Sequence, residues 1–203
     1  MQIQGVVAAG ANAQSAGPGT ILNLRQGQLG DVIVSELQAR YYEQTYRKNK
    51  FSWANPAAVT PSATFAGTAP TSTLYNLPGA SVNLVLTKVS ALFAAAPAGA
   101  VVVGLVAGFN GAAPTGITAG TPISNFLGGA VGQGKVATAI TLGTAPALIL
   151  PILAVEAASS ITPAGGFIDV GGSIIIPPGG YVAVSANAAA SIFAGFEWDE
   201  VPV

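Results

Sequence analysis

Histidine and cysteine are both absent from this chain of 203 residues. Without cysteine the chain has no disulfide, no thiolate nucleophile and no cysteine-ligated metal site. Without histidine, the Ser/His and Cys/His catalytic pairs, histidine-ligated zinc sites and the usual proton shuttle at neutral pH are excluded as well. We therefore expect no enzyme activity, no cofactor and no bound metal.

Charge is also scarce. Only 7% of the residues are Asp, Glu, Lys or Arg, whereas ordinary soluble chains contain about 25%. The net charge is −1 and the only basic run is at residues 47–50, so we expect no nucleic-acid partner, which would need many phosphate-facing Lys and Arg. Weak charge repulsion favours association, and we expect the chain to work inside a larger assembly.

The polar residues that are present gather in one stretch. Residues 24–53 hold eight of the fifteen charged residues and three of the five tyrosines. Tyr, Trp and Arg are enriched at protein interface hot spots, and the acidic residues of the stretch argue against stacking on single-stranded nucleic acid. We predict a partner-binding segment, with a solvated helix face as the alternative. Its candidate residues are Arg40, Tyr41, Tyr42, Tyr46, Arg47, Phe51 and Trp53.

The sequence predicts two parts. Residues 1–56 form an N-terminal arm or attachment segment, flexible or extended over residues 1–20, with a short strand at residues 31–35. Residues 35–50 fit either a helix or an extended segment lying across a partner. The Thr/Pro/Ala-rich stretch 55–70 resembles a linker, so we place a β-domain at residues 57–203.

Alternation of apolar and polar residues, with a period of two, predicts antiparallel strands in this second part. Gly, Pro, Asn and Thr separate them as turn residues, and we find no internal repeat. About eight short strands joined in this way predict an all-β antiparallel sandwich of the jelly-roll type. The expected strands cover residues 81–86, 101–109, 123–126, 135–142, 167–170, 173–176, 180–187 and 191–199.

Two motifs suggest chemistry that their context does not support. Residues 129–135 match G-x-x-x-x-G-K, but Val136 stands where the magnesium-binding Ser or Thr belongs and a strand, not a helix, is expected to follow. Glu197 and Asp199 share one face of the last strand and could hold a divalent cation or act as an acid/base pair, although a salt-bridging surface is the commoner use. Outside the N-terminal stretch, a hydrolase could draw only on Glu156, Asp169, Glu197, Asp199 and Glu200.

Residues 91–109 and 136–155 are free of charge and long enough to cross a bilayer as helices. Both contain glycine or proline within the apolar run, and neither has a Lys/Arg-rich flank. Buried strands joined by turns explain both spans, so we expect no membrane partner.

Four features together carry a resemblance to a known class of proteins. They are the segment GDVIVSELQARYYEQTYRKNKFSWAN, the Thr/Pro-rich spacer, the charge-poor domain with IIIPPGGYVAV, and the ending FEWDEVPV. In this layout the chain resembles structural proteins of tailed bacteriophage virions, and most of all the jelly-roll proteins that decorate or cement capsids.

The resemblance implies a homo-oligomer, with a trimer favoured, bound to the major capsid protein or other virion proteins. The protein would be made in the host cytoplasm and would reside on the capsid surface. Fibre, spike and tail-adaptor proteins share the layout. A carbohydrate-binding module of a virion is a further alternative, and it would use Tyr181, Trp198 and the Gly-rich loops.

Overall fold

The structure is a computed structural model that describes residues 41–116, 118–138, 140–156 and 165–203. The expected arm, the predicted strand at residues 31–35 and the candidate Arg40 lie outside these residues. The chain divides into two compact units, residues 1–42 and 43–203. Within the described residues there are one short helix, α1 (Tyr42–Tyr46), and eleven strands: β1 (Lys50–Ala54), β2 (Ser72–Tyr75), β3 (Val82–Phe93), β4 (Val101–Phe109), β5 (Thr118–Gly120), β6 (Ile123–Ser124), β7 (Lys135–Thr138), β8 (Ala147–Val155), β9 (Gly165–Ile176), β10 (Gly180–Ala186) and β11 (Ile192–Pro202).

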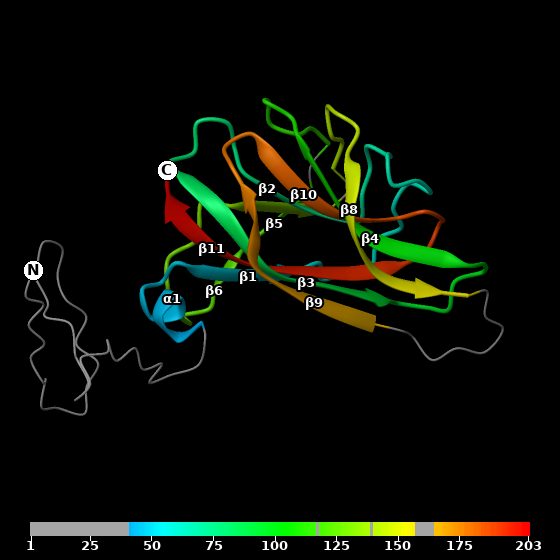
Figure 1. Cartoon of the computed structure of the whole chain (residues 1–203), viewed down its shortest axis with the longest axis horizontal. Coiled ribbons are helices and arrows are strands. Elements are labelled where there is room, and N and C mark those ends of the chain that lie inside the picture. The colour runs from blue at the N-terminus through cyan, green and yellow to red at the C-terminus, as the bar shows by residue number, and fades with distance from the viewer. Residues whose placement is uncertain (1–40, 117, 139, 157–164) are drawn as a thin grey trace, which may run out of the picture. The chain divides into compact units, whose positions relative to one another are not determined.

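These strands form two antiparallel sheets that pack face to face, so the predicted all-β sandwich is confirmed (Figure 1). The five-stranded sheet has the order β6-β1-β11-β3-β9, and the six-stranded sheet has the order β5-β7-β2-β10-β4-β8. In Figure 1, β11 and β3 run side by side in one layer while β10 and β4 lie in the other.

The pairing of the strands is nested. β1 pairs with β11, β2 with β10, β3 with β9 and β4 with β8. The chain therefore runs out through β1 to β4 and returns through β8 to β11, and successive strands alternate between the sheets, as in a jelly roll. The three remaining strands are inserted between β4 and β8 and extend one side of the sandwich, because β6 lies beside β1 while β7 and β5 lie beyond β2.

The core forms from the inward-facing residues of both sheets, as the two-residue period predicted. Leu84 and Leu86 on β3 and Trp198 on β11 are fully buried. Phe51 on β1 stacks against Trp198 with ring centroids 6.0 Å apart. The same cluster contains Val182 and Val184 from β10.

The boundary predicted at residue 56 is wrong, because β1 is a strand inside the five-stranded sheet, paired with β11 on one side and β6 on the other. Phe51 and Trp53 alternate with Lys50 and Ser52, so one face of β1 enters the core. Of the alternatives for residues 35–50, a helix is present in the described part only over the five residues of α1.

The stretch expected to be a linker connects β1 to β2 and covers the outer face of the six-stranded sheet. A Cβ added at Gly104 of β4 would lie 3.3 Å from the ring of Phe65, and the Leu142 amide donates a hydrogen bond to the Thr68 carbonyl. A second apolar cluster lies on this side and includes Tyr75, Ile140 and Leu142. As a result, β10 is buried along its whole length, where the sequence predicted a strand with one buried face.

The two strands predicted at residues 167–170 and 173–176 are one strand, β9. Gly171 and Gly172 have φ values of 60° and 83°, which side-chain-bearing residues rarely adopt, and they let the strand continue through a kink. The Asp169 carboxylate accepts a hydrogen bond of 2.8 Å from the Gly171 amide. Opposite the kink, the register of β3 shifts between Leu86 and Lys88.

Candidate functional site

The outer face of the five-stranded sheet is the best candidate for a functional surface, because the chain's own loops cover the opposite sheet. Two adjoining hollows of about 420 and 440 Å³ lie on this face and share Ala54, Ser90 and Phe167. Ala54, Gly195 and Ser90 are cross-strand neighbours on β1, β11 and β3. Because these residues are small, they leave space above the backbone of the sheet. We call this surface the open face.

Apolar side chains surround the hollows. Phe167 on the edge strand β9 is 74% exposed, and Ile123 on the opposite edge strand β6 is 59% exposed. Leu92 and its cross-strand neighbour Phe193 line one end. Exposed apolar side chains grouped around a hollow are typical of surfaces that bind another molecule.

A row of polar residues crosses the open face next to the hollows. Ser52, Glu197, Lys88 and Asp169 are successive cross-strand neighbours on β1, β11, β3 and β9. The Lys88 ammonium lies 3.4 Å from a carboxylate oxygen of Glu197, and both side chains are about one-third exposed. An ion pair this accessible contributes about 0.2–1 kcal/mol to fold stability. Its main effect is to fix the positions of the two charged groups on the surface.

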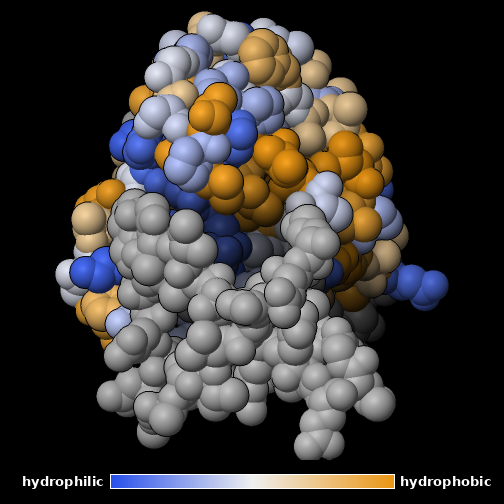
Figure 2. All heavy atoms as spheres, turned by 60° about the vertical axis from the view of Figure 1, so that its left-hand side comes forward, coloured by the Kyte–Doolittle hydropathy of each residue, from blue (hydrophilic) through white to orange (hydrophobic). Residues whose placement is uncertain are grey.

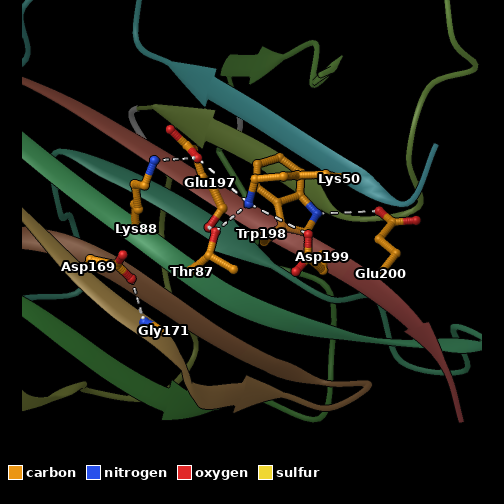
Figure 3. A network of polar contacts seen from close by, with 9 residues as sticks. All are labelled: Lys50, Thr87, Lys88, Asp169, Gly171, Glu197, Trp198, Asp199 and Glu200. Carbon is orange, nitrogen blue, oxygen red and sulfur yellow. Dashed lines mark hydrogen bonds and ion pairs between the residues drawn. The ribbon is translucent and has the colours of Figure 1, made fainter. Parts of the chain in front are cut away.

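Lys50 lies at one end of this face and is almost fully buried, with 2% exposure. Its ammonium donates a hydrogen bond of 2.7 Å to the Thr87 hydroxyl, which in turn donates to the Glu197 carbonyl at 3.0 Å. The same ammonium lies 3.6 Å from Asp199 and 3.7 Å from the Glu197 carboxylate (Figure 3). The register shift in β3 places Thr87 beside Lys50, so the irregularity supplies one of the buried cation's partners.

The predicted placement of Glu197 and Asp199 on one face of the last strand is thus present, and Lys50 ion-pairs with both carboxylates. Burial raises the pKa of the Asp199 carboxyl, and the neighbouring Lys50 ammonium offsets part of that rise. In the described part of the chain, no group of three or more acidic residues comes together in a way that could hold a metal ion. The arrangement resembles a salt-bridging structural cluster rather than a cation site.

The loop over residues 129–135 binds an anion, but the anion belongs to the chain itself. The Glu200 carboxylate accepts hydrogen bonds from the Gly134 amide at 2.7 Å and from the Gln133 amide at 2.9 Å. A Cβ added at Gly132 would lie 2.4 Å from this carboxylate, so the glycine allows the close approach. Glu200 therefore occupies the two amides that a phosphate-binding loop would offer to a nucleotide.

The residues predicted to bind a partner fall into two groups. Phe51 and Trp53 are buried in the core, with 4% and 8% exposure, so their assignment to a partner surface is wrong for the folded chain. Tyr42, Tyr46 and Arg47 are exposed, and Tyr41 is half-buried. The alternation of Phe51 and Trp53 with Lys50 and Ser52 was the signal for a strand, but the surrounding charges obscured it.

The aromatic pair proposed for a carbohydrate platform is also buried. Trp198 is in the core, and Tyr181 donates a hydrogen bond of 2.8 Å from its hydroxyl to the Thr144 carbonyl. Sequence reasoning missed Phe167, the most exposed aromatic side chain on the open face, because it lies in a short apolar run beside two glycines. Its placement on an edge strand follows only from the strand order.

None of the helices in the described residues has the length and apolar character needed to cross a membrane. Comparisons of the chain with protein-family models, with curated proteins and with solved structures find no match.

Proposed function

We propose that this chain is a non-enzymatic virion structural protein that binds or cements a capsid lattice as a symmetric oligomer. The observation that carries the proposal is the asymmetry of the sandwich. One sheet is covered by the chain's own loops over its central strands β2 and β10, and the other presents the hollowed, largely apolar open face. The layout shared with phage virion proteins gives the class of partner.

The open face has the chemistry of a contact surface. Phe167, Leu92 and Ile123 expose apolar area that water disfavours by about 25 cal/mol per Å². The polar row with Lys88 and Glu197 supplies fixed charges across it, which set the orientation of a partner. A partner bound stably to this face would cover roughly 800 Å² of it.

Low charge fits the same proposal. Figure 2 shows hydrophobic residues in contiguous groups beside hydrophilic ones on the side of the molecule turned forward there. A protein that remains dispersed usually keeps such groups small and surrounds them with charges. A protein that is buried between capsid subunits needs no such protection.

The test is co-sedimentation of the purified full chain with capsid shells assembled from the major capsid protein of the same phage. We expect saturable binding, and we expect the double variant Phe167→Ser, Leu92→Ser to bind at least about tenfold more weakly, which corresponds to about 1.4 kcal/mol. Phe109→Ser is the matched control, because Phe109 is also exposed but lies on the six-stranded sheet. No binding by the wild-type chain would remove the capsid proposal.

The hollows favour one alternative, a carbohydrate-binding virion module. The Phe167 ring could stack against a sugar. The hydroxyls of Ser52 and Ser90 and the Lys88 ammonium line the same hollow and could hydrogen-bond to the sugar hydroxyls. Binding to a glycan array by the wild-type chain, lost in Phe167→Ser, would favour this alternative over capsid cementing.

The remaining alternative, a fibre, spike or tail-adaptor protein, would be recognised by its location in sectioned or immunogold-labelled virions.

A further inference from the structure

The two sides of the sandwich are unlike each other in charge and alike in apolar character. β8 and β9 are edge strands of their sheets and are in contact with each other, so they form one side. β5 and β6 are the opposite edges, and the loop that follows β6 lies on their side. We name these the return side (β8, β9 and Glu156) and the insertion side (β5, β6, residues 125–135 and the neighbouring Lys48).

The return side exposes aliphatic residues and carries acidic charge. Leu148 and Ile149 on β8 and Ile175 on β9 are 44–60% exposed. The charged residues described on these strands and directly after β8 are Asp169 and Glu156, both acidic and exposed. β8 also contains Pro151 and two register shifts, and β9 contains its glycine kink, so neither strand offers a regular edge for adding another strand.

The insertion side is apolar and basic. Leu127 and Val131 are 84% and 63% exposed, the highest values among the large apolar side chains of this loop. The Lys48 ammonium lies 5.0 Å from the centre of the Phe126 ring, and Lys135 follows the loop directly as the first residue of β7. Glu200 holds the loop in place through the Gln133 and Gly134 amides, so its apolar tip is presented by a fixed backbone.

We propose that the return side of one copy packs against the insertion side of the next, and that this heterologous contact closes the symmetric oligomer as a ring. An apolar acidic side and an apolar basic side are complementary to each other, and neither is complementary in charge to itself. The irregular edges direct the contact to side chains and away from strand addition, which would lead to open fibres. This inference rests on the proposed function only for the existence of a symmetric oligomer.

Two surface variants test the contact. The return-side variant is Ile149→Asp with Ile175→Asp, and the insertion-side variant is Leu127→Asp with Val131→Asp. Light scattering should give three times the chain mass of 20.0 kDa for the wild type and for the Phe109→Ser control. Each variant alone should be a monomer, because every contact in a heterologous ring uses both sides. Circular dichroism and thermal unfolding show whether each variant keeps the fold.

Mixing the variants gives the decisive readout. The intact insertion side of the first variant and the intact return side of the second can form one contact and no more, so sedimentation velocity should show a 1:1 complex of the two chains. This complex should be weaker than the ring, because it lacks ring closure. A folded mixture that stays monomeric, or a single variant that still forms a dimer through one side, would overturn the heterologous contact.

Capsid binding is measured separately on the same samples. A wild-type chain that is monomeric in solution and on the capsid, yet still binds shells, overturns this inference and leaves the proposed function standing. A wild-type ring whose variants behave as expected, but which does not bind shells, supports the inference and removes the capsid proposal.

Discussion

At the residue scale, Glu200 shows how an anion-binding loop can serve the fold. Its carboxylate satisfies two backbone amides, and the Trp198 indole nitrogen lies 3.4 Å away as a third donor. Glycine at positions 132 and 134 leaves room for the carboxylate and for the Trp198 ring, respectively. The G-x-x-x-x-G-K pattern therefore did indicate backbone donors around an anion, while the source of that anion was not visible in the pattern.

Glu200→Gln should lower the free energy of unfolding by about 1–3 kcal/mol, because the new amide group faces a backbone N–H with its own N–H. Urea denaturation measures the change. Glu156→Gln is the control, since that carboxylate is exposed and its replacement should fall within about 0.5 kcal/mol of the wild type. Equal stability of both variants would show that the loop does not depend on Glu200.

Asp199 should make stability depend on pH in the acid range. Burial raises the pKa of this carboxyl in the folded state, so the folded chain holds the proton more tightly than the unfolded chain. The contribution of the protonated Asp199 carboxyl to the free energy of unfolding is therefore fully present below its pKa in the unfolded chain, about 3.9. This contribution is lost as the pH rises through the pKa of the same carboxyl in the folded chain.

The variant Asp199→Asn lacks this contribution. Urea denaturation at a series of pH values should show the stability of the wild type, relative to the variant, falling as the pH rises from about 3 to 7. Lys50 and Glu197 face the same carboxyl and are unchanged in both proteins. A relative stability that rises with pH would mean that attraction to Lys50 outweighs burial.

At the element scale, β1 belongs to the fold and not to an attachment segment. Trp53→Ala should destabilise the chain by about 3–5 kcal/mol, because it removes a buried indole from the core. Tyr42→Ala changes an exposed side chain and should alter stability by less than about 0.5 kcal/mol. Thermal and urea unfolding compare the two. If Trp53→Ala unfolds normally but loses its place in the assembly, the strand is a partner-binding element after all.

Strands that are bounded by Gly, Pro or Asn turn residues, or that alternate in polarity, could be predicted from the sequence. β4 matches its predicted residues, and β10 and β11 match theirs to within three residues at each end. β2 is buried on both faces and so shows no alternation. β8 escaped prediction because Pro151 interrupts an apolar run, although an edge strand tolerates proline.

The candidate site was predictable only in part, for a similar reason. The two-residue spacing placed Glu197 and Asp199 on one face, because that geometry is local to a strand. Lys50 could not be recognised as their partner, since the pairing of β1 with β11 joins residues far apart in the sequence. The open face combines residues of all five strands of its sheet, and the hollows depend on that strand order.

At the scale of the whole molecule, the surface has three kinds of area with different roles. The loops over the six-stranded sheet close one face, the open face is available to a lattice, and the two sides are available to neighbouring copies. The two proposals use different centres of contact, which are Ser90 and Gly195 on the open face, and the β8 edge and residues 125–134 on the sides. They meet along β6 and β9, which belong to both surfaces.

The nested strand order also has a consequence in time. β11 lies between β1 and β3, so the five-stranded sheet stays divided until residues 192–202 have been synthesised. Chains dominated by such distant pairings fold slowly, and their unpaired apolar strands adhere to one another meanwhile. A nascent chain of this kind is at greatest risk on the ribosome, where many unfinished copies are crowded together, and its yield should depend on how long chaperones can hold it before the last strand arrives.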